Sequence, residues 1–436
     1  MIPDLSNHFN DRKPSAIRLA QIKFAERTDK TSPINTAIGN VSLPVHPAIA
    51  ERMFNLDKPA SPFAESVVKY TATVGMAETN RAFLNIISSS GFETEGLYSQ
   101  ITNGGSQAME MVILGVCGQA GSSEAPLLLI DAAYTNYNAL AKRVGRRTVS
   151  VSRRLKENGE FSLPSIDEIE SVIIKEKPGA MVVIPYDNPT GQFYNKEALV
   201  RLAEICVKHN IWMISDEAYR ELFYTGEKTS SIWGITDSDV PGIEGRRISI
   251  ETSSKVWNGC GLRIGAMITD RKDFHEKSVA ECTADLCANA IGQYIFAALA
   301  DEDHESLAKW YDTQREYYRN MLVSLTERFK VLIPGVIVSN PDASLYSVVD
   351  VRNVVDNSFD ALDFVLYCAQ EGKVDIGGEE LTLLVAPMSG FYSLPEGAEN
   401  PGRTQMRIAY VESPERMALV PDLFSSLLEQ YKNRTK

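Results

Sequence analysis

The sequence predicts an α/β protein: a buried, mostly parallel sheet with helices on both faces, joined to a smaller α+β domain. Three observations predict this fold. Short, nearly continuous apolar runs recur in the middle of the chain, with stretches of helical spacing between them, as in parallel strands buried on both faces. After residue 265 long helical stretches take over, and short strands then mix with helices. With 436 residues, the chain is also too long for one small core.

The expected elements follow from these runs. The sheet strands are expected at 126–131, 180–185, 211–215 and 247–251, with helices over 138–142 and 196–208. Long helices are expected from about 272 to 300 and from 304 to 329. The C-terminal part is expected to contain strands over 344–351 and 405–411 and helices over 359–370 and 414–432.

These elements group into three segments. Residues 56–305 are expected to form a large domain, and residues 306–436 a smaller C-terminal domain. Residues 1–55 show little alternation of strand and helix, so we expect this segment to pack back onto the small domain.

Composition excludes several classes of function. The net charge is -13, without a block of like charges, which argues against nucleic acid or an anionic membrane surface as a partner. No apolar run approaches the length of a membrane span, and the N-terminus lacks the pattern of a secretory signal. The six cysteines have no metal-ligand spacing, so we expect reduced thiols, a cytoplasmic protein and no metal site.

Lys255 ends a Thr-Ser-Ser-Lys run over 252–255, and Arg263 follows it in Gly-Leu-Arg-Ile-Gly. This pattern suits a cofactor that carries an aldehyde and a phosphate. The amine can condense with the aldehyde, while hydroxyls and a guanidinium hold the phosphate. Pyridoxal phosphate fits that description. The alternative is a solvated surface lysine.

Polar residues follow the expected strands, at the sheet edge where ligands of such folds bind. Asp216 ends the run 211–215, where a carboxylate can pair with a protonated pyridine nitrogen. Tyr219 and Asn188, the latter in an Asn-Pro-Thr-Gly turn, can reach the phenolic oxygen of the same ring. The alternatives are a helix N-cap, a packed tyrosine and an ordinary turn.

Three further positions add to this constellation. Gly105 and Ser106 precede a helical stretch, so backbone N–H groups and a hydroxyl can face an anion there; a serine N-cap is the alternative. Tyr134 follows the run 126–131 and can lie flat on a planar ring, or simply pack in its loop. Arg407 lies in an apolar strand and needs a partner, either a substrate carboxylate or an internal acid.

Together these residues resemble the class I/II aminotransferases of fold type I, pyridoxal 5'-phosphate enzymes typified by aspartate aminotransferase. The resemblance covers nearly the whole chain and implies a large domain with a mostly parallel sheet of the seven-stranded type. It implies that Lys255 is the Schiff-base lysine and that Asp216 pairs with the ring nitrogen. The other cofactor-binding residues that it implies are Gly105, Ser106, Gln107, Tyr134, Asn188, Tyr219, Thr252, Ser254, Arg263 and Tyr70.

The same resemblance implies the substrate contacts and the assembly. Arg407 would hold the α-carboxylate, and Gly39 and Asn188 would line the substrate pocket. Tyr70 matches the tyrosine that the family lends across a dimer interface to the partner's phosphate, which implies a homodimer. The implied activity moves an amino group between an α-amino acid and a 2-oxo acid.

The sequence departs from the family pattern in places. Thr252 stands where serine is commoner, and Ala132 and Ala133 precede Tyr134 where many relatives have a proline nearby. The stretch 281–293 contains no arginine, whereas some aspartate-specific members use one near there for the side-chain carboxylate. Either this chain reads acidic substrates differently or its substrate is not acidic.

Three rivals to transamination remain open at this point. Another fold type I enzyme, such as a carbon–sulfur lyase, a decarboxylase or an enzyme like aminocyclopropane-carboxylate synthase, would share nearly all these residues. A non-catalytic regulator would usually add a basic DNA-binding module, which the sequence does not show. A nucleotide-binding protein would need a Gly-x-Gly-x-x-Gly turn, which residues 102–107 do not supply. The sequence leaves the amino donor and acceptor open.

Overall fold

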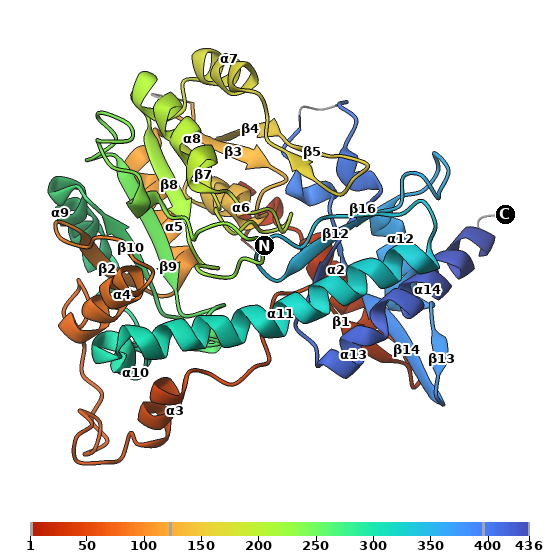
Figure 1. Cartoon of the computed structure of the whole chain (residues 1–436), viewed down its shortest axis with the longest axis horizontal. Helices are drawn as coiled ribbons and strands as arrows, with labels where there is room; N and C mark the ends of the chain where they lie inside the picture. Colours follow the sequence, from red (N-terminus) through yellow and green to blue (C-terminus); the bar gives the residue numbers. More distant parts are fainter. Residues whose placement is uncertain (1–2, 122–123, 395–396, 435–436) are drawn as a thin grey trace.

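The computed structural model describes residues 3–121, 124–394 and 397–434. It contains a larger α/β part and a smaller C-terminal part, and the long helix α11 (His304–Leu332) runs along the molecule from one to the other (Figure 1). The polar residues predicted to form the site come from both parts, so the way the two parts meet decides the geometry of the site.

The larger part is built on a seven-stranded sheet in the order β2-β10-β9-β8-β7-β3-β4. Its strands are β2 (Tyr98–Thr102), β3 (Leu127–Asp131), β4 (Thr148–Ser152), β7 (Ala180–Val183), β8 (Trp212–Asp216), β9 (Arg247–Thr252) and β10 (Gly265–Thr269). Neighbours pair in parallel except β10, which is antiparallel to both β9 and β2. The predicted mostly parallel sheet is confirmed.

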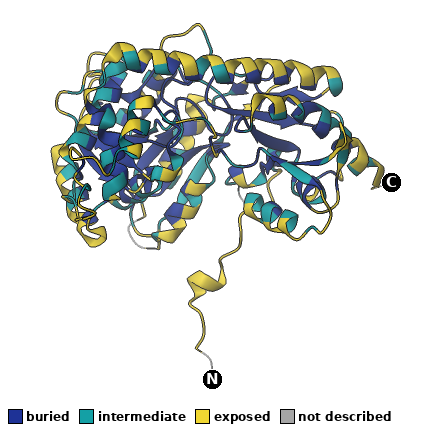
Figure 2. Ribbon diagram, turned by 90° about the horizontal axis from the view of Figure 1, so that it is seen from below, coloured by how far each residue is buried: buried dark blue, intermediate teal, exposed yellow. Residues whose placement is uncertain are grey.

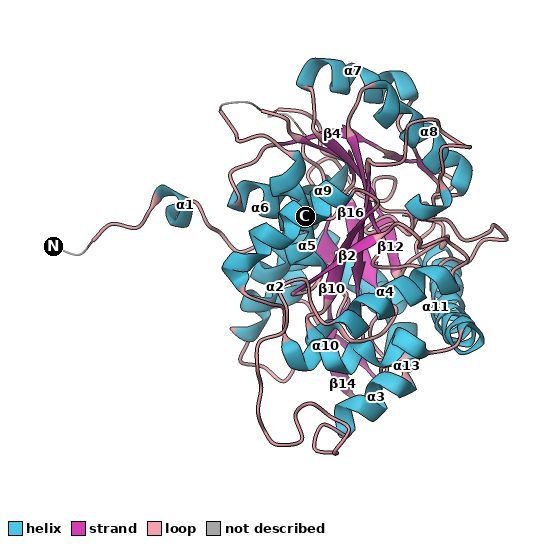
Figure 3. Cartoon of the chain, turned by 90° about the vertical axis from the view of Figure 1, so that its left-hand side faces the viewer, coloured by secondary structure: helices cyan, strands magenta, loops and turns pink. Residues whose placement is uncertain are grey.

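Side chains alternate between two cores on the two faces of this sheet. In β3, Leu128 and Ile130 pack into one core, while Leu127 and Leu129 pack into the other. Because both faces are buried, every residue of β3 is apolar except its last, Asp131. The strands lie between two layers of helices (Figure 3).

The helices that cover the sheet contribute to one core or the other. On one face lie α5 (Gly105–Val116), α6 (Asn136–Arg143) and α9 (Lys272–Glu281). On the other lie α4 (Ala77–Ser89), α7 (Ile166–Glu176), α8 (Lys196–Lys208) and α11. The predicted helix over 196–208 is confirmed at both ends, since Asn195 caps its first turn by accepting a hydrogen bond from Ala198 N.

The smaller part is built on two sheets, with α-helices packed against them. One sheet has the order β11-β12-β16-β15 and the other β1-β14-β13. Their strands are β1 (Ser32–Asn35), β11 (Ile337–Val338), β12 (Tyr346–Asp350), β13 (Val374–Ile376), β14 (Glu379–Leu384), β15 (Ala386–Pro387) and β16 (Gln405–Ala409). The helices are α12 (Ala361–Gln370), α13 (Pro414–Ala418) and α14 (Val420–Arg434).

The N-terminal segment contributes to the smaller part. Strand β1 pairs in parallel with β14, and α2 (Ala16–Ala25) packs against α12. By contrast, α3 (Pro47–Phe54) contacts the larger part through α10 (Ala290–Phe296). The domain boundaries at residues 55 and 305 stay predictions.

The first described residues form an arm that projects from the body (Figure 2). It carries the short helix α1 (Asn7–Asn10), with Leu5 and Phe9 exposed. The remaining short elements are β5 (Arg154–Leu155), β6 (Phe161–Ser162) and the 3-10 helices η1 (Ile232–Gly234), η2 (Cys260–Leu262), η3 (Cys282–Asp285), η4 (Ala297–Asp301), η5 (Ser389–Phe391) and η6 (Pro401–Arg403).

Two stretches predicted as continuous helices are interrupted in the structure, so these two predictions are wrong. The stretch 272–300 is broken into α9, η3, α10 and η4, because Leu286 adopts a left-handed φ of 68° that no α-helix accommodates. Asn289 then starts α10 by accepting a hydrogen bond from Gly292 N. The stretch 414–432 is likewise two helices, α13 and α14, which Leu419 separates.

Two observations bear on the surroundings of the protein. Among residues 3–121, 124–394 and 397–434, no helix combines the length and apolarity needed to cross a bilayer. All six cysteines are free thiols, and four of them are buried.

Helix α7 offers a matched test of the sheet packing. Ile173 is 3% exposed in the core, whereas the adjacent Ile174 is 65% exposed. Ile173→Ala is expected to lower the free energy of unfolding by about 2–5 kcal/mol, because it leaves a cavity in a packed interior. Ile174→Ala is expected to change it by less than about 0.5 kcal/mol. Urea unfolding followed by circular dichroism measures both, and equal effects would contradict this packing.

Candidate active site

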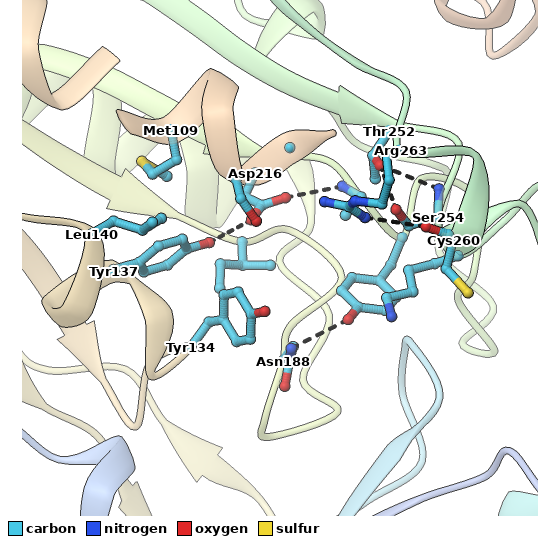
Figure 4. A pocket seen from close by; sticks show the side chains of 16 residues that line it. Met109, Tyr134, Tyr137, Leu140, Asn188, Asp216, Thr252, Ser254, Cys260 and Arg263 are labelled. Carbon is cyan, nitrogen blue, oxygen red and sulfur yellow. Dashed lines mark hydrogen bonds between the residues drawn. The ribbon is translucent and has the colours of Figure 1, made fainter. Parts of the chain in front are cut away.

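A cavity opens where several sheet strands end. Asp216 is the last residue of β8, and Thr252 is the last residue of β9. Figure 4 shows these side chains turned toward one another around the cavity. Its lining residues are Gly105, Ser106, Met109, Tyr134, Tyr137, Leu140, Ile184, Asn188, Asp216, Ala218, Tyr219, Thr252, Ser254, Lys255, Cys260 and Arg263. Ten of the predicted site residues therefore share one cavity.

Asp216 is held from two sides. Its Oδ2 accepts a hydrogen bond from the hydroxyl of Tyr137 at 2.5 Å, and its Oδ1 accepts one from Ala218 N at 3.1 Å. Burial raises the pKa of Asp216, and these two hydrogen bonds oppose that shift. The sequence did not predict Tyr137; the available signal was its spacing of three residues from Tyr134 at the start of a helix.

A hydrogen-bond network joins the larger part to the smaller part beside this carboxylate. Asn188 Nδ2 donates to the Tyr219 hydroxyl at 3.2 Å, and Asn188 Oδ1 accepts from Arg407 Nη1 at 2.9 Å. The hydroxyls of Tyr219 and Tyr346 lie 2.8 Å apart. Burial raises the pKa of Tyr219 well above its usual value, so its phenol stays protonated and can donate. The sequence did not predict Tyr346, which reaches the network from β12.

Arg407 is a buried cation, only 3% exposed. Its Nη2 donates to Ala37 O at 2.6 Å, and its guanidinium carbon lies 4.4 Å from the ring centre of Tyr346. Its Nε has no hydrogen-bond partner, and no carboxylate of the described residues lies within 4.0 Å of it. The internal acid that the sequence allowed is therefore absent from the described part of the chain. An anionic ligand would supply the missing partner.

Lys255 lines this cavity. Its Nζ donates to Gly39 O at 2.5 Å, which brings the N-terminal segment against the cavity. A Cβ on Gly39 would lie 2.2 Å from the hydroxyl oxygen of Tyr346 and 3.4 Å from Lys255 Nζ. Only glycine leaves room for this approach of the backbone to the lysine.

One group of lining residues is suited to an anion. Helix α5 begins at one of them, Gly105, so its first N–H groups and its dipole face the cavity. The hydroxyls of Thr252 and Ser254 lie 2.7 Å apart. The guanidinium of Arg263 approaches so closely that a Cβ on Gly104 would lie 2.4 Å from its Nη2. Hydroxyls, N–H groups and a guanidinium form a phosphate-binding set.

Two predicted residues lie apart from the cavity. Gln107 turns away, and its Nε2 donates to Asp285 Oδ2 at 2.7 Å. Tyr70 is 78% exposed on a separate hollow, formed mostly by residues 59–77. Gly39 and Arg407 do not line the cavity but adjoin it through Lys255 and Asn188. The roles of all these residues stay predictions.

Arg153 holds two of the loops in place and was not predicted. It is buried and forms an ion pair of 2.9 Å with Asp187, next to Asn188. It also donates to the carbonyl oxygens of Ile130, at 3.2 Å, and of Ala132, in the loop that carries Tyr134. One guanidinium thus fixes the spacing of the Tyr134 and Asn188 loops.

Solved structures of aminotransferases have the same fold as this chain over nearly its whole length. A solved structure of a single mutant of Thermus thermophilus aspartate aminotransferase matches with a TM-score of 0.79 and 20% identity, over 98% of this chain and 100% of that one. An N-succinyldiaminopimelate aminotransferase from Mycobacterium tuberculosis matches with a TM-score of 0.78 and 19% identity, over 97% of this chain and 100% of that one. At such identities the likeness shows the fold.

Sequence comparison agrees. An aspartate aminotransferase of Thermotoga maritima is 28% identical over 189 residues, which is 43% of this chain and 46% of that protein. Aromatic-amino-acid aminotransferase 2 of Thermococcus litoralis is 24% identical over 323 residues, 74% of this chain and 75% of that protein. The chain spans about half the length of several curated relatives that it matches.

A family model described as aminotransferase class I and II matches residues 64–381, more than half of the chain. Members of this family use pyridoxal 5'-phosphate. The predicted resemblance is confirmed. This chain belongs to the class I/II aminotransferase family.

Proposed function

We propose that this protein is a pyridoxal-phosphate-dependent aminotransferase that moves an amino group between an α-amino acid and a 2-oxo acid. One observation carries the proposal: the buried cation Arg407, without an acidic partner among the described residues, is hydrogen-bonded to Asn188 of the cavity that also contains Lys255 and Asp216. A cation with a free donor next to an amine and a buried acid is suited to binding the carboxylate of an amino acid.

The donor set fits the cofactor at both ends. Gly105, Ser106, Thr252, Ser254 and Arg263 would hold the phosphate, since they join a helix N-terminus to hydroxyls and a guanidinium. At the other end Asp216 would pair with the ring nitrogen. Tyr219 and Asn188 would bind the phenolic oxygen, and Tyr134 would lie on the ring. When bound, the cofactor supplies an aldehyde that condenses with amines and a ring that withdraws electrons from the substrate α-carbon.

The residues around it would orient the substrate and move its proton. Arg407 and Asn188 would hold the α-carboxylate, which turns the bond to the α-hydrogen toward Lys255. Lys255 Nζ would take that proton and return it to the product side, while Gly39 O positions the amine. The ionised carboxylate of Asp216 would stabilise positive charge on the ring nitrogen.

We also propose a cytoplasmic homodimer in which Tyr70 reaches the phosphate site of the partner subunit. Val67, Val68 and Tyr70 are exposed on one segment, and an exposed apolar run of this kind supports a protein interface. The six free thiols fit a reducing compartment.

A single-turnover reaction tests the proposed activity. Mixing the purified holoenzyme with a panel of amino acids is expected to yield a 2-oxo acid and the amine form of the cofactor in equal amounts. A carbon–sulfur lyase or a decarboxylase would instead release other products and leave the cofactor as an aldehyde. Such products without the amine form would contradict transamination.

Lys255→Ala is expected to lower kcat by about 10⁴-fold or more, because no other amine of the described residues lines the cavity to carry the proton. The visible absorbance of lysine-bound cofactor is expected to disappear as well. Lys272→Ala, an exposed lysine on α9, is the control and is expected to retain both. Stopped-flow absorbance and steady-state kinetics measure the two effects, and a Lys255→Ala protein that keeps them would overturn the assignment.

Asp216 is expected to lower the stability of the cofactor-free protein at neutral pH. Because burial raises its pKa above the unfolded value of about 3.9, the folded chain keeps a proton that the unfolded chain loses, and stability falls as pH rises past that value. Asp216→Asn is therefore expected to unfold at a higher temperature than the parent at pH 8, with the difference shrinking toward pH 4. Exposed Asp57→Asn is the control. Scanning calorimetry of the cofactor-free proteins checks this.

Tyr70→Phe is expected to raise the dissociation constant of the cofactor about tenfold, because one hydrogen bond to a charged phosphate would be lost. Tyr367→Phe, remote from the cavity, is the control. Equilibrium dialysis gives the dissociation constants, and analytical ultracentrifugation gives the oligomeric state. A fully active monomer with unchanged affinity in Tyr70→Phe would remove the proposed dimer without affecting the chemistry.

A further inference from the structure

A second cavity, of about 560 Å³, continues from the first at Lys255 and Cys260, the two residues that line both. It extends along the N-terminal segment past Gly39 and Asn35 to Glu412, which follows β16. Its position beside the reacting amine makes it the space into which a substrate side chain would extend.

The N-terminal segment is hydrogen-bonded to both Glu412 and Arg407. Asn35 N donates to Glu412 Oε1 at 3.2 Å, and Ala37 O accepts from Arg407 Nη2 at 2.6 Å. Glu412 and the carboxylate-binding Arg407 therefore both contact the same short stretch of backbone, residues 35–37.

Besides the reacting lysine, the second cavity has a negatively charged side chain in its lining, Glu412. Of the described residues that line it, only Lys255 and Glu412 are charged, and the other polar groups are neutral side chains such as Gln21 and Asn40. No arginine or histidine of the described residues lines it, so Lys255 is the one cation that the described lining offers to a side-chain carboxylate.

The carboxylate of Glu412 is only loosely neutralised. The nearest cation in an ion pair with it is Arg416, at 3.7 Å, and the Glu412 side chain is 28% exposed. Arg416 is shared, because it also lies 3.9 Å from Glu379 and donates to Pro33 O at 2.9 Å. Glu412 therefore keeps an accessible negative charge at the cavity wall.

Resting on the proposed function, we propose that the amino-acid substrate has a cationic side chain, whose ammonium or guanidinium group pairs with Glu412 while its α-carboxylate binds Arg407. A partly exposed pair of this kind adds modest affinity, and the same glutamate repels a substrate that ends in a carboxylate. Glu412 would thus select the substrate in two ways, by attracting a cationic side chain and by repelling an anionic one. A purely structural Glu412 would only anchor β1 through Asn35.

Three five-carbon acids without an α-amine separate these roles. Isothermal titration calorimetry of the holoenzyme would compare 5-aminopentanoate, pentanoate and glutarate, which differ only in the terminal group. We expect 5-aminopentanoate to bind about fivefold more tightly than pentanoate, and glutarate to bind more weakly than both. Glu412→Gln keeps an acceptor for Asn35 N, and we expect it to remove the preference while leaving pentanoate binding unchanged.

Glu379→Gln is the matched control, because it removes a carboxylate beside the same Arg416 but outside the cavity. It is expected to keep the preference for 5-aminopentanoate. Glutarate binding as tightly as 5-aminopentanoate to the parent protein, or a preference that survives Glu412→Gln, overturns the proposal. If the variant does not fold, the comparison of the three acids on the parent protein decides alone.

Single turnovers with arginine, norleucine and glutamate distinguish this proposal from the proposed function. Arginine offers a cationic side chain without a second reactive amine, and we expect it to convert the cofactor fastest. Conversion that is faster with norleucine or glutamate overturns the cationic substrate while transamination stands. Absence of conversion with every amino acid of a full panel contradicts the proposed function itself.

Discussion

The burial of the parallel sheet on both faces is the constraint on which the rest of the structure depends. Strands that run in one direction end at one edge, and polar side chains are tolerated where the strand leaves the core. Asp216 and Thr252 stand at two such ends, on adjacent strands. The antiparallel β10 brings Gly265 beside Thr252 and Thr102, so the start of helix α5 and the Arg263 turn meet at the same edge.

The site is made of groups that are unfavourable to bury without a ligand. Burial raises the pKa of Asp216, and Arg407 has a buried Nε with no partner. A buried charge without a partner lowers stability, and such groups persist where a ligand completes them. The surrounding structure holds them in position through Tyr137, on Asp216, and Asn188, on Arg407. The cost of burying these groups and their affinity for a charged ligand thus have the same physical origin.

The N-terminal segment connects the two parts of the molecule at the reacting groups. It pairs with β14 of the smaller part and places the carbonyl oxygens of Ala37 and Gly39 on Arg407 and Lys255. The same segment contacts Glu412, so the groups that would read the two ends of a substrate are tied to one stretch of backbone. A movement of this segment would change the carboxylate site and the side-chain site together.

The local sequence pattern was enough to predict the sheet strands and several of the site residues. The apolar runs predicted the sheet strands, and the residues directly after them, Asp216 and Asn188, could be placed at one edge because parallel strands share an end. Lys255 and Arg263 could be predicted as site residues because Thr252 and Ser254, which are close to them in sequence, line the same cavity. The sequence pattern therefore predicted those site residues that lie together at one strand end or in one turn.

Tertiary structure alone decided which distant side chains meet. Tyr346 lies 127 positions from its hydrogen-bond partner Tyr219, and Arg153 holds loops from two other strands. Neither contact leaves a periodic signal, because hydrophobic spacing records which face is buried and not what packs against it. The break at Leu286 was missed for the same reason: a helical spacing does not reveal a left-handed turn that neighbouring elements stabilise. Likewise Glu412 becomes part of a cavity with Lys255 only when the smaller part and the N-terminal segment close over the sheet edge.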